Sequence, residues 1–363
     1  MVGGHGFSSA FHDTSQPTAW LAPAYPALLA AIFLLFGTKS AASAVVAILL
    51  NTVFSSLTVF VLIRLGRDHF GRTAGLLAGW MWCVAPLPVY MPSYLWETCL
   101  SGLTLSFAFM LTIRLQRDSP WRAWICCGAF WGFAALLNPA LLAPLPVLVL
   151  TAARRAKRWK EPFLLAIVCA LMVAPWTIRN ARVLHRFIPV RSNSWAELYF
   201  GNIDFSVHPT GPSMKYQREG EIVFLDELKQ RTLNFVKSDP ASFLLQTERR
   251  VVHFWMSPPQ FSPYPIALLV MAVGGMVFAW TKTKLRADLG AVLVFYPLIY
   301  YVTYALARYR YPIEPMMCLL GAYFLWRILG VSRKPTDERR PDETRPDCRR
   351  AENPTSARFI MSS

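Results

Sequence analysis

Long apolar segments, separated by short basic ones, constrain this chain more than any other feature of its sequence. Residues 40–63 form the first run long enough to cross a bilayer as a helix, because a crossing needs about 20 residues. Further apolar runs cover residues 73–91, 94–113, 161–178, 263–281, 288–306 and 311–330, and two shorter runs cover residues 123–137 and 139–152. Apolar residues make up 54% of the chain and charged residues 16%, whereas soluble domains have about 45–50% and about 25%. The sequence therefore predicts an all-α polytopic membrane protein with about nine transmembrane helices.

Two segments depart from this simple pattern. Residues 23–36 are apolar but too short to span, so they predict a juxtamembrane helix that ends at Gly37. Residues 123–152 are interrupted at Asn138-Pro139, which indicates either two short membrane helices or one long kinked helix.

The distribution of basic residues predicts the orientation. Every second loop is basic, and lysine and arginine collect in cytoplasmic loops. The chain is therefore expected to lie in the inner (plasma) membrane with its N-terminus outside and its C-terminus in the cytoplasm. The predicted parts are an extracytoplasmic segment with the juxtamembrane helix (1–39), an N-terminal transmembrane bundle (40–178), an α-rich extracytoplasmic loop domain (179–262), C-terminal transmembrane helices (263–330) and a disordered cytoplasmic tail (331–363).

Charge and cysteine content exclude several functions. The net charge of +16 is explained by topology, and no basic stripe with interleaved aromatic residues indicates a nucleic-acid partner. The seven cysteines lie in apolar segments or in the tail, so they predict neither a disulfide framework nor a zinc site. The sequence indicates no metal ligand set and no cofactor with certainty, and it leaves a divalent metal open.

Polar residues at the predicted outer face are the first candidates for a site. Glu97 is expected about one turn into a helix that starts at Ser93. A carboxyl group there is either functional or paired with an arginine near the interface. Arg179 and Asn180 follow an apolar helix predicted to end at Pro175-Trp176. They are either interface anchors or ligands of an anionic lipid headgroup, because a guanidinium group binds phosphate in a bidentate manner.

Arg308 and Arg310 form a second basic pair in a short turn on the same predicted face. Glu314 follows one turn later, where it either pairs with one of these arginines or contacts the substrate. In the long polar loop, Trp195, Glu197 and Asn202 combine aromatic, carboxylate and amide groups. This combination suits carbohydrate binding, although it also fits an ordinary loop. Residues 221–238 predict an amphipathic scaffold helix.

Four stretches together resemble bacterial membrane glycosyltransferases of the GT-C type, in the group of the protein O-mannosyltransferases and the aminoarabinose lipid A transferases. They are PTAWLAPAYPALLAAIFLLFG (17–37), SYLWETCL (93–100), APWTIRN followed by FIPVRSNSWAELYFGN (174–180 and 187–202), and RYRYPIEP (308–315). The resemblance implies a polyprenyl-phosphate-linked sugar as donor, transfer on the extracytoplasmic face, and a lipid, glycan or protein acceptor.

The resemblance also implies roles for individual residues. Arg179, Arg308 and Arg310 would contact the donor phosphate, and Glu97 would match the second acidic position of the active site. Asn180 would lie at the catalytic mouth and contact substrate. From their chemistry and position, Trp195, Glu197, Asn202 and Glu314 are further predicted substrate contacts.

One departure concerns the catalytic aspartate, which in this family lies just after the first transmembrane helix. The chain begins inside the corresponding loop, so the helix and the aspartate are expected to be missing from it. Asp13 does not stand in the family's acidic context, and the catalytic role is not carried onto it. Two other classes stay open: a transporter or lipid flippase that uses the same outer cavity, and a non-catalytic membrane scaffold.

Overall fold

The computed structural model describes residues 1–2, 4, 6–8, 16–203, 216, 219–256 and 263–329. The chain divides into two units, residues 1–329 and 330–363, and the second lies outside the described residues, as does Asp13. Apart from one bridge between Ser8 and Pro17, the regular structure in the described part is helical. The all-α prediction is confirmed for these residues.

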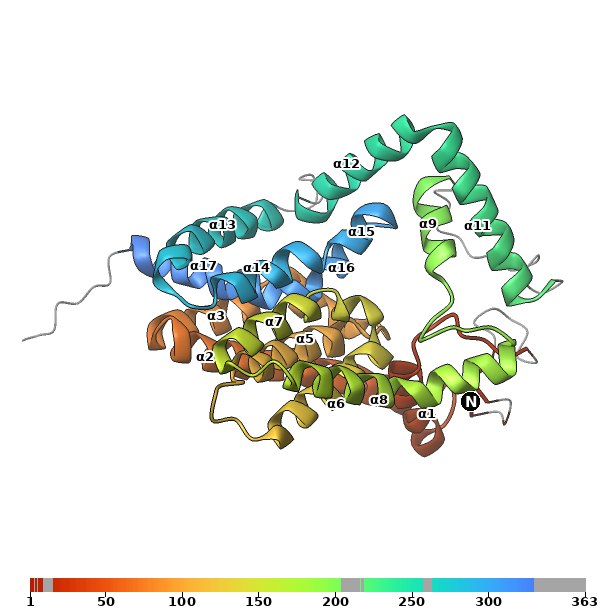
Figure 1. The fold of residues 1–363 in the computed structure, drawn as a ribbon, viewed down its shortest axis with the longest axis horizontal. Coiled ribbons are helices and arrows are strands. Elements are labelled where there is room, and N and C mark those ends of the chain that lie inside the picture. The colour runs from red at the N-terminus through yellow and green to blue at the C-terminus, as the bar shows by residue number, and fades with distance from the viewer. Residues whose placement is uncertain are drawn as a thin grey trace, which may run out of the picture. The chain divides into compact units, whose positions relative to one another are not determined.

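The helices follow one another along the chain in the order shown in Figure 1. The first half contains α1 (Ala24–Phe36), α2 (Ala41–His69), α3 (Arg72–Val84), α4 (Pro86–Tyr90), η1 (Met91–Ser93), α5 (Thr98–Ile113), α6 (Trp121–Leu137), η2 (Pro139–Leu142), α7 (Leu145–Ala156) and α8 (Glu161–Leu184). The second half contains α9 (Ser194–Asn202), α11 (Glu221–Ser238), α12 (Pro240–Met256), α13 (Tyr264–Lys282), α14 (Arg286–Phe295), α15 (Leu298–Val302), α16 (Ala307–Arg310), η3 (Tyr311–Ile313) and α17 (Glu314–Ile328).

Several helices have the length and composition of membrane spans. Among the described residues four qualify: α2, residues 139–156, α8 and α13. A fifth span arises if α3 and the segment Pro86–Ser93 count as one helix bent by 55°. The protein is thus a multi-pass membrane protein, but the predicted count of nine is not confirmed. Proline divides two of the predicted spans, at Pro86 and Pro297, because it removes a backbone donor and crowds the preceding turn.

Two boundaries differ from the expectation in ways that affect the site. Helix α8 continues through Pro175 to Leu184, so Arg179 and Asn180 lie in a helix and not after one. Glu97 does not lie within a helix but is the residue that precedes the first turn of α5. Two other predictions are confirmed: residues 221–238 form α11, and the extended backbone of Asn138 separates α6 from the following helical segment.

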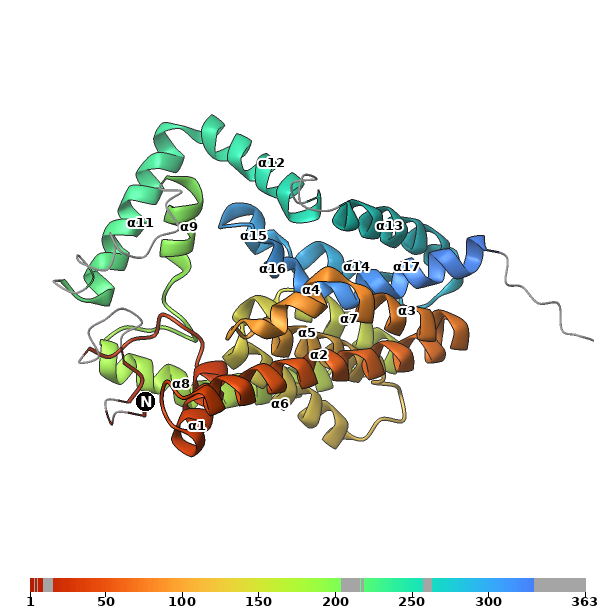
Figure 2. The same cartoon turned by 180° about the vertical axis from the view of Figure 1, so that it is seen from behind.

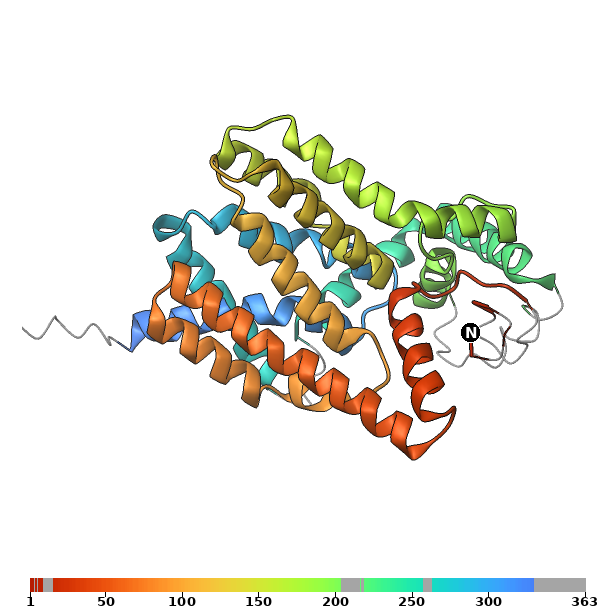
Figure 3. The ribbon, with the colours of Figure 1, turned by 90° about the horizontal axis from the view of Figure 1, so that it is seen from below.

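Small residues let neighbouring helices approach closely, as is common in membrane bundles. Helices α2 and α3 lie side by side (Figure 2), and a Cβ atom built on Gly66 would stand only 2.2 Å from the Cα atom of Gly75. Helices α6 and α8 form a second close pair (Figure 3), where a Cβ atom on Gly128 would stand 2.6 Å from the carbonyl oxygen of Leu165. Larger residues at either glycine would separate the helices.

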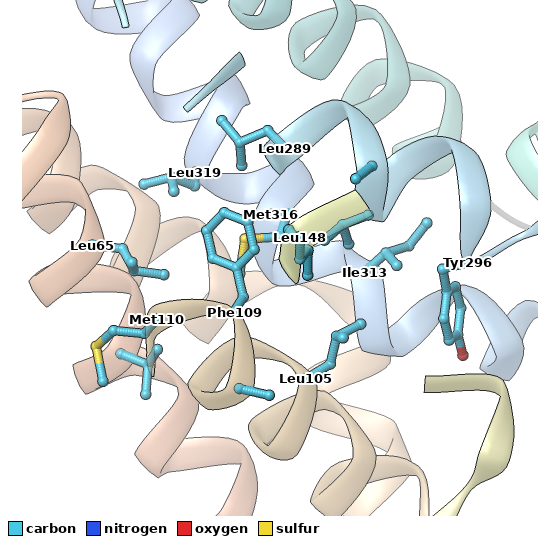
Figure 4. Packing of buried hydrophobic residues seen from close by; sticks show 14 of the residues in the cluster. Leu65, Leu105, Phe109, Met110, Leu148, Leu289, Tyr296, Ile313, Met316 and Leu319 are labelled. Atoms are coloured by element: carbon cyan, nitrogen blue, oxygen red, sulfur yellow. The ribbon is translucent and has the colours of Figure 1, made fainter. Parts of the chain in front are cut away.

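The main apolar core joins helices from both halves of the chain. Figure 4 shows Phe109 of α5 packing among side chains of α2, α7, α14 and α17, including Leu65, Leu148, Leu289 and Met316. A buried ion pair adds a polar link, because Arg155 of α7 donates to Asp288 of α14 over 2.6 Å. This packing brings α5 and the segment that contains α16 together, so residues 95–97, directly before α5, and Arg308 and Tyr309 of α16 line the cavity described next.

Candidate functional site

A cavity of about 430 Å³ collects polar side chains from segments far apart in the sequence. Three of the residues predicted for a site lie in its wall: Glu97, Glu197 and Arg308. The remaining lining residues are Trp20, Leu21, Ala22, Tyr25, Pro26, Leu29, Leu95, Trp96, Leu137, Asn138, Arg191, Asn193, Tyr300 and Tyr309. The mixture of apolar walls and a few convergent charged groups is typical of ligand sites.

Arg308 is held by aromatic rings. Its guanidinium carbon lies 3.9 Å from the centroid of the Trp96 ring and 5.1 Å from that of Tyr309. Its Nη2 donates to the Tyr309 hydroxyl over 3.3 Å, whereas its Nε is buried and has no partner among the described residues. Within the described part of the chain no carboxylate pairs with Arg308 at salt-bridge distance. The aromatic contacts orient the cation and leave donors available for an anion.

Glu197 lies in the first turn of α9, beside Asn193 at the start of that helix. The Asn193 Nδ2 donates to Glu197 Oε1 over 3.0 Å, and the buried Asn193 Oδ1 has no partner in the described structure. Burial raises the pKa of the Glu197 carboxyl group, while the charges of Arg191 and Arg308 act in the opposite direction. Glu197 is therefore a stronger base than a carboxylate in water.

Glu97 lies in the cavity wall, directly before the first turn of α5. Its backbone carbonyl accepts the first hydrogen bond of the helix, from the Ser101 N–H over 2.7 Å. Its half-buried side chain lines the cavity and makes no hydrogen bond with another described residue. The helix start fixes the backbone of this carboxylate and leaves its oxygens available.

A second glutamate, Glu221, holds the wall of the cavity without lining it. It is buried at the start of α11 and accepts hydrogen bonds from the Thr18 hydroxyl, the Ala19 N–H (3.1 Å), the Ser192 hydroxyl (2.6 Å) and the Tyr216 hydroxyl (2.6 Å). It thereby joins the segments that carry Trp20 and Arg191 into the cavity wall. The sequence indicated only a scaffold helix here, because the four donors come from three other parts of the chain.

Arg179 and Asn180 also hold the cavity wall in position, but they do not line the cavity. Arg179 donates to the carbonyl oxygens of Thr18 and Phe7, each over 2.7 Å. Asn180 is fully buried and donates to the carbonyl of Ile188 over 3.0 Å. Their side chains brace the N-terminal segment and the 188–193 segment, so the implied contact of Arg179 with donor phosphate has no support in this geometry.

Arg310 and Glu314 pair with each other. Arg310 Nε lies 2.8 Å from Glu314 Oε1, and both side chains are almost completely buried, at 1% and 0% exposure. Arg310 also donates to the Trp255 carbonyl over 2.9 Å. The pairing alternative raised by the sequence is thus what the structure shows, and neither residue lines the cavity.

Asn202 and Trp195 also lie off this cavity. Asn202 is buried, donates to the Val302 carbonyl over 3.0 Å and accepts from Arg250 over 2.9 Å, which joins the end of α9 to α15 and α12. Trp195 lines a separate cavity on the other side of α9. The cavity is also lined by residues that were not among the predicted site residues, above all Arg191 and Asn193. The signal for Arg191 was the excess of arginines on the predicted outer face, and the signal for Asn193 was its nearness to Glu197 in the chain.

No group of three histidine, cysteine, aspartate or glutamate residues in the described structure has the arrangement needed to hold a metal ion.

The family match covers the N-terminal part of the chain. Residues 16–178 match the family described as dolichyl-phosphate-mannose-protein mannosyltransferase. No curated protein matches the chain. Among solved structures, ArnT from Cupriavidus metallidurans, bound to undecaprenyl phosphate, shares 16% identity, with 87% of this chain and 69% of that chain covered and a TM-score of 0.39. That score is too low to transfer any position from one chain to the other. Over residues 16–178 the family match confirms the resemblance to GT-C-type membrane glycosyltransferases.

Proposed function

We propose that this protein is a membrane glycosyltransferase that moves a sugar from a polyprenyl phosphate to an acceptor hydroxyl. The observation that carries the proposal is the convergence, in one cavity, of the available guanidinium of Arg308 with the carboxylates of Glu97 and Glu197. A glycosyl transfer of this type needs a cation for the leaving phosphate and a carboxylate for the acceptor. The match of residues 16–178 supports the same reaction class.

Arg308 is the proposed ligand of the donor phosphate. Negative charge develops on the phosphate oxygens as the bond to the sugar breaks, and a positioned guanidinium stabilises that charge. The contact with Trp96 fixes the guanidinium plane, and the buried Nε supplies a donor that has no partner in the described structure. Arg191, which lines the same cavity, supplies a second positive charge.

The two carboxylates receive different roles. Glu97 is the proposed base that accepts the proton of the acceptor hydroxyl as the oxygen attacks the anomeric carbon. Glu197, oriented by Asn193, is proposed to accept a hydrogen bond from a sugar hydroxyl. The proton goes to the carboxylate, the new bond forms to the acceptor oxygen, and the polyprenyl phosphate leaves with the electrons of the old bond.

The donor class is proposed from the family description, which names dolichyl-phosphate-mannose, a sugar linked to a polyprenyl phosphate. The distribution of basic loops supports a position of the cavity on the extracytoplasmic face of the inner membrane. The acceptor on that face is a lipid, a glycan or a protein.

The test is transfer from a radiolabelled polyprenyl-phosphate sugar in membranes that contain the full chain. Glu97→Gln should abolish label transfer and Arg308→Gln should lower it by about 10²–10³-fold. Arg182→Gln, at an exposed position of α8 outside the cavity, should retain the wild-type rate. Wild-type rates in both site variants would overturn the assignment of the site.

A further inference from the structure

A smaller cavity of about 190 Å³ lies on the opposite side of the first turn of α9. Trp195 faces this second cavity, whereas Asn193 and Glu197 face the candidate site. Residues two apart in a helix point about 200° apart, so a single turn separates the two spaces. Arg191 lines both cavities and therefore connects them.

The charges around the second cavity favour an anion. Arg186 and Arg191 line it together with a single carboxylate, that of Asp226. The ammonium of Lys229 adds positive charge 5.5 Å from the centroid of the Trp195 ring. The described structure shows no carboxylate paired with Arg191 at salt-bridge distance. Two lining cations thus face one lining carboxylate, and Lys229 adds a third positive charge beside Trp195.

The existing ion pair in this cavity is easily exchanged. Arg186 Nη1 lies 2.5 Å from Asp226 Oδ2, but the two side chains are 43% and 44% exposed. Exposed pairs of this kind contribute little, because water screens them and two long side chains must be ordered. A ligand anion can therefore replace Asp226 as the partner of Arg186 at small cost.

The remaining wall suits a sugar ring. Trp195 supplies an aromatic surface together with the apolar residues Ile188, Pro189 and Leu225, and the exposed Ser194 adds a hydroxyl group to the lining. Sugar rings present C–H groups on one face and hydroxyl groups at the edge, which matches an aromatic surface bordered by polar groups. The volume is below the range of about 300–1,000 Å³ for drug-sized ligands and holds a single ring.

We propose that the second cavity is a subsite for an anionic sugar ring, one that carries a phosphate or a carboxylate group, of the acceptor. Its position relies on the proposed transferase function, because Arg191 links it to the donor-phosphate cavity. The binding chemistry stands independently: Arg186 and Arg191 hold the anion, and Trp195 packs against the ring.

The test is equilibrium binding to the purified full chain in nanodiscs, which requires no turnover. Glucose 6-phosphate and glucuronate should bind, and they distinguish a phosphate from a carboxylate as the charged group; binding of either supports the subsite. Neutral glucose should bind at least tenfold more weakly. Inorganic phosphate should also bind at least tenfold more weakly, because it lacks the ring that packs on Trp195. Phosphate binding equal to that of the sugar phosphate would overturn the inference.

Variants then test the residues. Trp195→Ala and Arg186→Gln should each weaken binding by about tenfold. Asp226→Asn should strengthen it by about two- to fivefold, because the competing carboxylate is removed. Trp159→Ala and Arg182→Gln, at exposed positions outside both cavities, are the matched controls and should bind as the wild type does.

Unchanged binding in Trp195→Ala, or weaker binding in Asp226→Asn, would contradict the subsite. Failure of the transferase assay with intact anionic-sugar binding would overturn the proposed function and leave the binding site in place.

Discussion

Arg308 and Arg310 lie two residues apart in the short helix α16. Among the described residues Arg310 has a carboxylate at salt-bridge distance, whereas Arg308 has none. Arg310 is buried and held by Glu314 at 2.8 Å, so its charge is neutralised within the bundle. Arg308 faces a cavity, lies over Trp96 and keeps a buried donor without a partner among the described residues. One arginine therefore stabilises the fold, and the other is available for a ligand. The comparison shows that a basic motif indicates a site only after the partners of each cation are known.

The largest expected effect is a loss of folding stability when the buried ion pair between Arg310 and Glu314 is broken. Glu314→Ala leaves the guanidinium of Arg310 buried without a carboxylate, and loss of one partner of a buried pair costs about 3–5 kcal/mol of folding free energy. Thermal unfolding of the detergent-solubilised protein should show a large drop in midpoint relative to Arg308→Gln, which should differ little from the wild type. An equal midpoint in both variants would contradict the division of roles.

Loss of Arg308, the member that faces the cavity, should affect sugar transfer instead. Arg308→Gln should lower the rate of sugar transfer by about 10²–10³-fold, which corresponds to about 2.7–4 kcal/mol of transition-state stabilisation. Arg308→Lys should recover only part of the rate, because an ammonium lacks the planar fork that binds phosphate at two points. Full activity in the lysine variant would show that charge alone is sufficient there.

A smaller effect on activity is expected from substitution of Glu221, which holds the cavity wall in position. Glu221→Gln places an amide NH₂ where four donors now point, so at least one of the hydrogen bonds to Thr18, Ala19, Ser192 or Tyr216 is lost. Loss of a buried hydrogen bond costs about 1–3 kcal/mol. The KM for the donor should rise more than kcat falls, and Glu221→Asp should restore part of the affinity. A change in kcat alone would indicate direct participation in the chemistry.

The smallest effect is a pH dependence of stability from Glu197. Burial raises the pKa of this carboxyl group, so the folded state binds its proton more tightly than the unfolded state does. Stability must therefore fall as the pH rises from the unfolded pKa through the folded one. Thermal unfolding between about pH 4 and 8 should show the wild type losing stability relative to Glu197→Gln over this interval. A gain relative to the variant would contradict the sign.

The sequence predicted the features that depend on local pattern. Apolar runs gave the helical membrane architecture, the amphipathic repeat gave α11, and Asn138-Pro139 gave a helix boundary. Glu97, Glu197 and Arg308, which the sequence predicted as candidate site residues, line one cavity in the structure.

Features that depend on distant contacts could not be predicted in this way. Helix α8 continues past Pro175, and the side chains of Trp176 and Thr177 donate to the carbonyls of Val190 and Pro189, which ties the helix to a later segment. Membrane helices tolerate proline where neighbouring groups satisfy the backbone. In the same way, the burial of Arg310 follows from its phase in α16, which a motif of alternating arginines does not reveal.

The central claim is that Arg308 holds the phosphate of a polyprenyl-linked donor. The most direct measurement is equilibrium binding of a radiolabelled polyprenyl phosphate to the full chain in nanodiscs, for the wild type, Arg308→Gln and the control Arg182→Gln. Binding should weaken by at least about tenfold in Arg308→Gln, in keeping with the loss of a charge-assisted hydrogen bond, and should not change in the control. Equal affinity in the wild type and Arg308→Gln would contradict the account.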